Sequence, residues 1–401
     1  MTSRNDLSLP TSAIAARYDV VVIGARAAGA STAMLLARRG LSVLAVDRGA
    51  YGSDTTSTHS LARAGVLQLS RWGLLDRLRA AGTPVTRTVV FRYDDDPIVI
   101  DVSSDGDVDG LYSPRRTVLD RILVDAAIEA GADVVHGVSV TGLRAVDGRV
   151  TGVDLDIGGE RRRVDAAWVI GADGVRSRVA AQVDAPFIHQ DEVTSSNIYA
   201  YWTGLADDVM ENHYDTIGRA VGVIPTNDGE TCVWVAIPPE RFRAEARGDL
   251  SGAYHRIIAE SPHLTELLSA STCNGGYRGF AGTPGFLRQA YGSGWALVGD
   301  AGYFKDPVSA HGITDAFIGA ELLSDALAAI VTDGDNPEES LAAYQRQRDN
   351  LAAMLTPPVA ALAGLDLDPA AAKAAFRALN PALRAEFELM AARPTRILVG
   401  V

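Results

Sequence analysis

The chain has 401 residues, 47% of them hydrophobic, which is enough to bury a substantial core in two or three structural units. Its 37 basic and 50 acidic residues give a net charge of −13, which argues against a nucleic-acid partner and an anionic membrane surface, because clustered positive charge binds both. The two cysteines show no metal-ligand spacing, so we predict no metal site and a reducing compartment.

The first elements in chain order predict a nucleotide-binding type of unit. Residues 18–23 (YDVVVI) are a β-branched apolar run, which is typical of a buried parallel strand. A helix of small residues follows over 27–39, and a second buried strand over 42–46 ends at Asp47. Strand, helix and strand within about 30 residues indicate a β-α-β unit. Residues 1–17 have no apolar signal-peptide core, so we expect a disordered lead-in there.

The rest of the chain alternates between helical and strand patterns. We expect helices over 60–82, 116–131, 314–330 and 337–354, two strands within 85–102, three within 134–170, mainly strands over 197–239, and a late strand over 295–298. This order predicts an α/β fold, α+β overall, with a Rossmann-like cofactor domain, an inserted antiparallel-sheet substrate domain and a helical C-terminal segment. We assign 18–84, 111–182 and 272–335 to the cofactor domain, 85–110 and 183–271 to the inserted sheet, and 336–401 to the C-terminal segment.

The turn after the first strand is a degenerate nucleotide-binding motif. It reads Gly24-Ala25-Arg26-Ala27-Ala28-Gly29, where dinucleotide folds have Gly-x-Gly-x-x-Gly for a tight turn, a close pyrophosphate approach and close helix packing. Arg26 replaces the second glycine and either points outward or reaches a phosphate. Asp47, 23 positions after Gly24, can accept hydrogen bonds from an adenosine ribose; the alternative is a turn residue at a strand end.

Three further motifs follow strands or open a helix. Gly171-Ala172-Asp173-Gly174 follows the strand at 168–170, and Gly299-Asp300 follows the strand at 296–298 before continuing to Pro307 and Gly312. A carboxylate at a strand end, in a turn of small residues, suits the hydroxyl groups of a ligand. The fourth motif is Arg116-x-x-Leu119-Asp120-x-x-Leu123, with the arginine at a helix start.

With these motifs in this order over residues 18–347, the sequence resembles the flavoprotein superfamily typified by p-hydroxybenzoate hydroxylase, which includes aromatic monooxygenases, flavin-dependent halogenases and geranylgeranyl reductases. The runs DTTSTH (54–59) and GDAGYFKDPVSAHGITDAF (299–317) are similar to a bacterial subgroup commonly described only as FAD-dependent oxidoreductases. The resemblance implies that FAD is the cofactor and NAD(P)H a transient reductant. The residues that it implies for FAD binding are Gly24, Arg26, Ala27, Ala28, Gly29, Asp47, Arg48, Arg116, Asp173, Asp300, Pro307, Gly312 and Ile313.

By the same resemblance, Pro307 and the turn Ala310-His311-Gly312 would face the isoalloxazine ring. A helix that starts near Gly312 would aim its free N–H groups and positive end at the flavin pyrimidine, which stabilises the anionic reduced flavin. Relatives often have Gly-x-Gly at this turn, whereas this chain has Ala310, so the sequence leaves the backbone path of the turn open.

Several chemistries stay open. We expect a monooxygenase, in which NAD(P)H reduces FAD and oxygen forms a C4a-hydroperoxide that attacks a small apolar or aromatic molecule of the secondary-metabolite type. One alternative is a flavin-dependent reductase or dehydrogenase without oxygen insertion, although 233–238 (VWVAIP) has valines where geranylgeranyl reductases have aromatic residues. A halogenase would need a lysine between flavin and substrate, and here Lys305 lies in the flavin motif and Lys373 in the tail. A catalytically inert flavin-binding scaffold is the last alternative.

Two histidines are candidate catalytic residues. His311 adjoins the proposed flavin-facing turn, where it could handle protons near neutral pH or simply pack at the helix start. His59 ends a Ser/Thr-rich loop, where it could contact the flavin or substrate, or cap the loop. In the inserted sheet, Tyr199, Tyr201 and Trp234 are candidates to face the substrate, although an aromatic stripe is also typical of a core.

The expected partner is a small-molecule substrate, with no nucleic acid and no stable membrane association, in the cytoplasm; a homodimer is left open. The apolar stretch 351–365 contains Pro357-Pro358 and is too short to span a bilayer. His213, His255 and His263 show no pattern that would pair them with one another.

Overall fold

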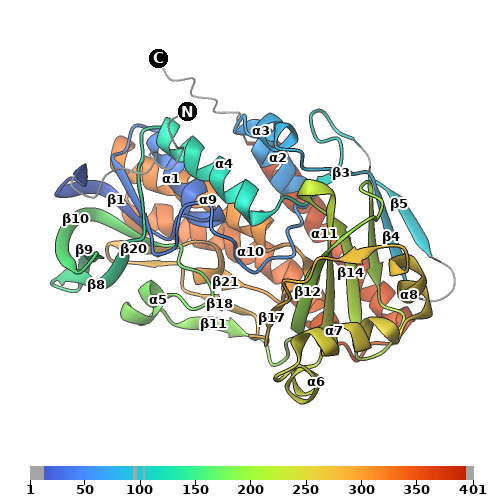
Figure 1. Cartoon of the computed structure of the whole chain (residues 1–401). Coiled ribbons are helices and arrows are strands. Elements are labelled where there is room, and N and C mark those ends of the chain that lie inside the picture. Colours follow the sequence, from blue (N-terminus) through green and yellow to red (C-terminus); the bar gives the residue numbers. More distant parts are fainter. Residues whose placement is uncertain (1–12, 94–96, 103, 394–401) are drawn as a thin grey trace, which may run out of the picture.

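The structure, a computed structural model, describes residues 13–93, 97–102 and 104–393. Its elements gather around two large sheets, and helices from the C-terminal part of the chain pack against the cores of both (Figure 1). This arrangement confirms the predicted α/β fold with a Rossmann-like first unit.

The first sheet carries the nucleotide-type motifs. Its main path runs in the order β19, β20, β10, β1, β2 and β7, and neighbours from β20 to β7 are parallel. The bounds of these strands are Tyr291–Gly292, Trp295–Leu297, Glu160–Gly171, Arg17–Ile23, Val43–Asp47 and Asp133–His136, in the same order. Both faces of β1 and β2 are buried, which explains their nearly continuous apolar sequences.

Helices and a hairpin cover the two faces of this sheet. Val20 and Val22 point into a core formed with α1 (Ala27–Ala37), α4 (Arg116–Glu129) and α9 (Gly312–Ala328). The opposite face packs against the hairpin of β8 (Ser139–Val146) and β9 (Arg149–Ile157) and against α5 (Arg178–Gln182).

The second sheet is the predicted insertion. Its order is β16, β12, β15, β14, β13, β4 and β5, with β17 beside β12; its pairs are antiparallel except for the parallel pair of β13 and β4. The bounds in that order, with β17 last, are Thr272–Cys273, Ser196–Thr203, Glu230–Ile237, Ala220–Pro225, Val209–His213, Thr88–Arg92, Ile98–Asp101 and Arg278–Phe280. One face packs against α7 (Leu250–Ala259), α8 (Pro262–Leu268) and the neighbouring α6 (Pro239–Glu245).

The C-terminal helices cover the other face of the second sheet. The long helix α10 (Pro337–Ala363) continues through Pro357 and Pro358, and α11 (Pro369–Ala391) follows it. Apolar residues of both helices pack against the aromatic side chains of the sheet, and α11 also packs against α2 (Arg63–Arg71). Within the described part of the chain, no helix is long and apolar enough to cross a membrane.

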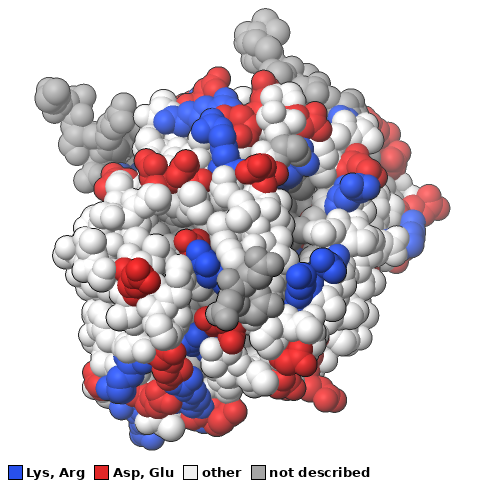
Figure 2. Space-filling view, turned by 90° about the vertical axis from the view of Figure 1, so that its right-hand side faces the viewer, with Lys and Arg blue, Asp and Glu red and all other residues white. Residues whose placement is uncertain are grey.

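Short elements complete the fold. A three-stranded sheet joins β11 (Phe187–Gln190), β18 (Phe286–Arg288) and β21 (Tyr303–Phe304), and β3 (Val85–Thr86) pairs with β6 (Leu111–Tyr112). On the face turned to the viewer in Figure 2, basic and acidic side chains occur in mixed groups, with broad areas of other residues between them.

Several element boundaries differ from the sequence-based expectation. The helix expected over 60–82 is two helices, α2 and α3 (Leu75–Ala80), because Gly73 adopts a left-handed φ of 72° between them. The region 134–170 holds four strands rather than three. Ile14, expected in a disordered lead-in, is buried, while residues 1–12 lie outside the described part. The domain boundary placed at 272 falls inside the second sheet, because β16 and β17 hydrogen-bond to β12.

Candidate functional site

The turn from β1 to α1 depends on two glycines. Gly24 has a φ of 100°, and a Cβ there would lie 2.3 Å from the carbonyl oxygen of Ala172. A Cβ on Gly29 would lie 1.8 Å from the carbonyl oxygen of Gly24. Helix α1 then starts at Ala27 with no side-chain cap from Arg26 and no acidic residue in its first turn. This helix start is therefore suited to an anionic phosphate group.

The side chain of Arg26 points toward Ser53 and Asp120 rather than outward. Its Nη1 donates to the carbonyl oxygen of Ser53 at 3.0 Å and to Oδ2 of Asp120 at 3.2 Å, and its Nη2 donates to Oγ of Ser53 at 3.0 Å. Asp120 also accepts from Nε and Nη2 of Arg116 at 3.0 and 3.1 Å. Two arginines thus share one carboxylate, which leaves net positive charge near the start of α1.

Asp47 lies directly beneath the glycine turn. Its Oδ2 accepts from the backbone N–H of Ala25 at 2.8 Å, and its Oδ1 accepts from that of Gly49 at 2.7 Å. The buried carboxylate thereby fixes the loop after β1 and the loop after β2 to each other. The neighbouring Arg48, also predicted to bind the cofactor, is exposed at the end of β2.

The carboxylate of Asp173 accepts hydrogen bonds from residues close to it in the chain. Its Oδ1 accepts from Oγ of Ser177 at 2.5 Å, and its Oδ2 accepts from the backbone N–H groups of Arg178 and Val179 at 2.7 and 3.2 Å. These bonds cap the start of α5. Its backbone nonetheless lies beside the glycine turn, because a Cβ on Gly24 would be 3.2 Å from the nitrogen of Asp173.

Asp300 differs from the other two carboxylates. Among the hydrogen bonds and ion pairs found in the described residues, none involves its side chain, and Oδ1 lies 4.0 Å from the Cβ position of Gly312 at the start of α9. Burial, and then the charge of Asp315, raises the pKa of Asp300 to about 6, although the positive charges of Arg116 and Lys305 act in the opposite direction. The structure therefore brings Asp300, Arg116 and the start of α9 together, with a carboxylate free to accept hydrogen bonds.

The turn before α9 is strained and held from both sides. Pro307–Ser309 form a short 3-10 turn, and Ala310 then adopts a left-handed φ of 50°, which is unfavourable for a residue with a Cβ. Asp306 accepts from the backbone N–H of Ser195 at 2.6 Å and from that of Val308 at 3.0 Å, so it joins this turn to the start of β12. The following residues Gly312, which is exposed, and Ile313, which is buried, open α9.

His311 is part of a buried charge cluster. Its Nε2 lies 2.7 Å from Oε2 of Glu386 on α11 and 3.8 Å from Oδ1 of Asp315. Nζ of Lys305 lies 2.8 Å from Oδ2 of Asp315. Burial alone would raise the pKa of Glu386, but the charge and hydrogen bond of His311 lower it. No local sequence pattern indicates that Glu386, a carboxylate near the C-terminus, reaches this turn.

His59 is buried and neutral at physiological pH. Burial, together with the positive charges of Arg115, Arg116 and Arg278, lowers the pKa of His59 to about 3. Its Nε2 lies 2.7 Å from Oη of Tyr201, and its backbone adopts a left-handed φ of 68°. The low pKa keeps this imidazole uncharged near neutral pH, and its hydrogen bond positions the ring of Tyr201.

The three aromatic candidates share one face of the second sheet. Tyr199, Tyr201 and Trp234 are buried in a cluster that also contains Val308 of the strained turn and apolar residues of α10 and α11. The guanidinium of Arg115 stacks over the ring of Tyr201, 3.7 Å from its centroid. The aromatic face, the His59 loop and the turn before α9 therefore converge at one place.

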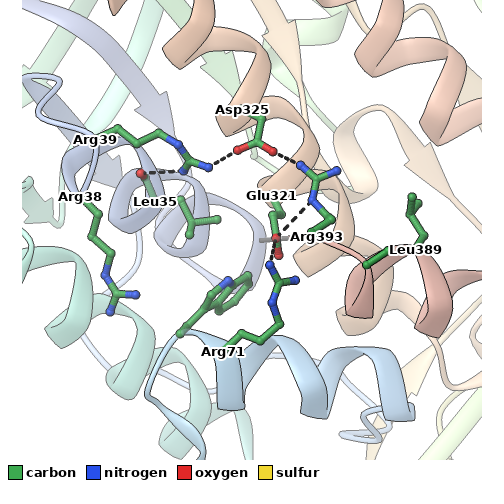
Figure 3. A pocket seen from close by; sticks show the side chains of 10 residues that line it. Leu35, Arg38, Arg39, Arg71, Glu321, Asp325, Leu389 and Arg393 are labelled. Atoms are coloured by element: carbon green, nitrogen blue, oxygen red, sulfur yellow. Dashed lines mark hydrogen bonds and ion pairs between the residues drawn. The ribbon is translucent and has the colours of Figure 1, made fainter. Parts of the chain in front are cut away.

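A pocket of about 400 Å³ lies elsewhere, between α1, α2, α9 and α11 (Figure 3). Glu321 lies 3.0 Å from Arg71 and 3.3 Å from Arg393, and Asp325 pairs with Arg39 and Arg393. The pocket includes none of the predicted site residues, and its two carboxylates offset half of the charge of its four arginines.

One protein family and several individual proteins match this sequence. The family model described as FAD binding domain matches residues 17–357. A digeranylgeranylglycerophospholipid reductase of Methanopyrus kandleri is 25% identical over 339 residues, which cover 82% of this chain and 81% of the relative. The protein FixC of Salmonella typhi is 27% identical over 229 residues, which cover 56% of this chain and 50% of the relative.

Solved structures show the same fold. A probable FAD-dependent monooxygenase from Pseudomonas aeruginosa superposes with a TM-score of 0.78 at 20% identity, covering 90% of this chain and 100% of the other. A flavin-dependent brominase has a TM-score of 0.78 at 21% identity and covers 93% of both chains. At these identities the likeness shows a shared architecture and does not decide the reaction.

Proposed function

Because the chain belongs to the FAD binding domain family and is a FAD-dependent oxidoreductase of that family, we propose that it is a monooxygenase that uses NAD(P)H and oxygen on a small apolar or aromatic molecule. The observation that carries this proposal is the enclosed aromatic face of the second sheet, which meets the turn before α9 at Val308. Enclosure by apolar side chains excludes water, which oxygen chemistry on a flavin requires if the reactive group is to reach a substrate.

The residues of the glycine turn and of the α9 turn fit FAD. The two glycines let the turn pack closely against the end of β10 and against its own backbone, and the start of α1 is uncapped. The unpaired carboxylate of Asp300 is placed to accept hydrogen bonds from ribityl hydroxyl groups. When bound, FAD supplies the electron transfer and the reaction with oxygen, because amino-acid side chains perform neither step readily.

The side chains of the site would then either position FAD and the substrate or supply charge beside them. Arg26 and Arg116 would hold positive charge beside the pyrophosphate, and the start of α9 would direct backbone N–H groups and a positive dipole end at the flavin ring. Tyr199, Tyr201 and Trp234 orient the substrate through ring contacts. Neutral His59 holds Tyr201 and leaves proton handling to solvent or to His311.

A reductase without oxygen insertion is the second candidate, and the sequence relatives favour it. The curated relative from Methanopyrus kandleri is a reductase, and the match extends over most of both chains. Against a prenyl-lipid substrate stands the packing of α10 and α11 on the aromatic face, which fits a compact molecule better than a long chain. Halogenation has less support, because Nζ of Lys305 is committed to Asp315.

One experiment separates these candidates. Full-length purified protein with bound FAD is reduced anaerobically with NADH or NADPH, and its spectrum is recorded before substrate and isotopically heavy oxygen gas are admitted. Heavy oxygen in the product supports the monooxygenase. Turnover under strict anaerobiosis, with a product that has gained hydrogen, supports the reductase. A flavin that neither nucleotide reduces, even with substrate present, points to an inert scaffold or to a separate reductase protein.

A further inference from the structure

Three side chains of the kinds that bind metal ions lie together on the face of the inserted sheet opposite the aromatic face. Glu211 and His213 stand two positions apart on β13, so their side chains leave the strand on the same side. His263, near the start of α8, meets them there: its ring centroid is 5.5 Å from that of His213, and the ring planes differ by 30°. Residues from two elements about 50 positions apart in the sequence thus share one small volume.

The spacing of their ligand atoms matches a metal coordination polyhedron. Nε2 of His213 lies 3.3 Å, and Nε2 of His263 lies 3.5 Å, from Oε2 of Glu211. Bonds of about 2.0–2.1 Å around a tetrahedral zinc ion separate neighbouring ligand atoms by about 3.3–3.4 Å. One ligand atom of each of the three residues lies within 4.8 Å of the other two.

Three imidazole nitrogens of this group form no hydrogen bond within the described residues, and two of them lie 3.3 and 3.5 Å from Oε2 of Glu211. His213 is fully buried, and neither of its ring nitrogens has a hydrogen-bond partner among the described residues; Nε2 of His263 has none either. Leaving a buried polar group without a partner costs about 1–3 kcal/mol. A buried imidazole that forms no hydrogen bond, beside a carboxylate and a second imidazole, is therefore better explained as a ligand than as a packing residue.

We propose that Glu211, His213 and His263 bind one divalent transition-metal ion, with zinc as the representative. Two imidazoles and one carboxylate suit Zn²⁺ or Ni²⁺ and not Mg²⁺ or Ca²⁺, which prefer oxygen ligands. The ion would join α8 to β13 on the sheet face opposite the aromatic one. The site is independent of the proposed oxygenase function, and its role is to fasten the helical layer to the sheet.

Arg92 sets the strength of this site. Its Nε donates to Oε2 of Glu211 at 2.8 Å. The guanidinium also competes with a cation for the same oxygen, which limits the affinity.

The test is a zinc titration by calorimetry on full-length, tag-free, FAD-loaded protein that has been stripped with a chelator. The wild type should bind one Zn²⁺ per chain and unfold at a higher temperature with zinc than without. His263→Gln removes a ligand whose side chain is 39% exposed, so the fold should persist while the affinity falls by roughly tenfold or more. His255→Gln, an exposed histidine on α7 outside the group, is the matched control and should bind as the wild type does.

Two results would overturn the proposal: no saturable zinc binding by the wild type, or equal binding by His263→Gln and the wild type. Arg92→Gln provides a second variant that keeps all three ligands. Because it removes the competing cation, it should strengthen zinc binding several-fold. An unchanged or weaker affinity in Arg92→Gln would contradict coordination by Glu211.

Discussion

Nε2 of His311 lies 2.7 Å from Oε2 of Glu386, so the turn that opens α9 is joined to the C-terminal helix across 75 positions of sequence. Both side chains are buried, and Asp315 and Lys305 extend the cluster on the other side of the histidine. The C-terminal helix is thereby fixed to the turn that is predicted to face the flavin, and it closes the aromatic face of the second sheet.

Glu386→Gln should loosen this connection. A hydrogen bond to a charged group such as the Glu386 carboxylate contributes about 1.5–3 kcal/mol, so the free energy of unfolding in urea should fall by about that amount. Limited proteolysis should also cut α11 sooner. Glu388→Gln, an exposed position on the same helix, is the control and should leave both readouts unchanged. Equal stability of Glu386→Gln and the wild type would show that the contact does not hold the helix.

Asp300→Asn should stabilise the FAD-free protein and weaken cofactor binding. Since the folded-state pKa of about 6 exceeds the unfolded value, Asp300 lowers stability above pH 6, and this penalty fades as the pH falls toward 4. The substitution should raise the free energy of unfolding at neutral pH by about 1–3 kcal/mol. It should also raise the dissociation constant for FAD, measured by flavin fluorescence, by roughly tenfold. Tighter FAD binding would contradict the ribityl assignment.

Ala310→Gly should stabilise the turn before α9. A residue with a Cβ pays roughly 1–2 kcal/mol in the left-handed region, part of which glycine loses again through the greater freedom of the unfolded chain. The expected net gain in the free energy of unfolding is about 0.5–1 kcal/mol. Ala316→Gly, inside α9, should instead destabilise by about 1 kcal/mol. If both substitutions destabilise the protein equally, Ala310 is not strained.

His59 should make the protein sensitive to mild acid. The pKa of His59 is 6.5 in the unfolded chain and about 3 in the folded one, so the unfolded chain binds a proton more readily. The free energy of unfolding is therefore unaffected by this group above pH 6.5 and falls as the pH drops below 6.5. Between neutral pH and about pH 4.5 this amounts to about 2–3 kcal/mol. His59→Gln should therefore lose less stability than the wild type over that interval, measured by urea unfolding at each pH. The exposed His189→Gln should keep the wild-type slope, and an identical slope for His59→Gln would refute the shift.

The sequence by itself determined those elements that depend only on residues close together in the chain. The run at 18–23, the glycines at 24 and 29 and the aspartates at 47 and 300 predicted a β-α-β unit and strand-end carboxylates, because periodicity and turn chemistry act over a few residues. Alternation in β12 also placed Tyr199 and Tyr201 on one face correctly.

Tertiary structure alone decided which distant side chains meet. The contact of His59 with Tyr201, the bond from His311 to Glu386, and the meeting of Glu211 and His213 with His263 join residues that no local pattern connects. Each depends on how a helix or loop packs on a sheet, and packing is set by the shape of whole faces. For the same reason the direction of Arg26 was open in the sequence and is fixed only by the positions of Ser53 and Asp120.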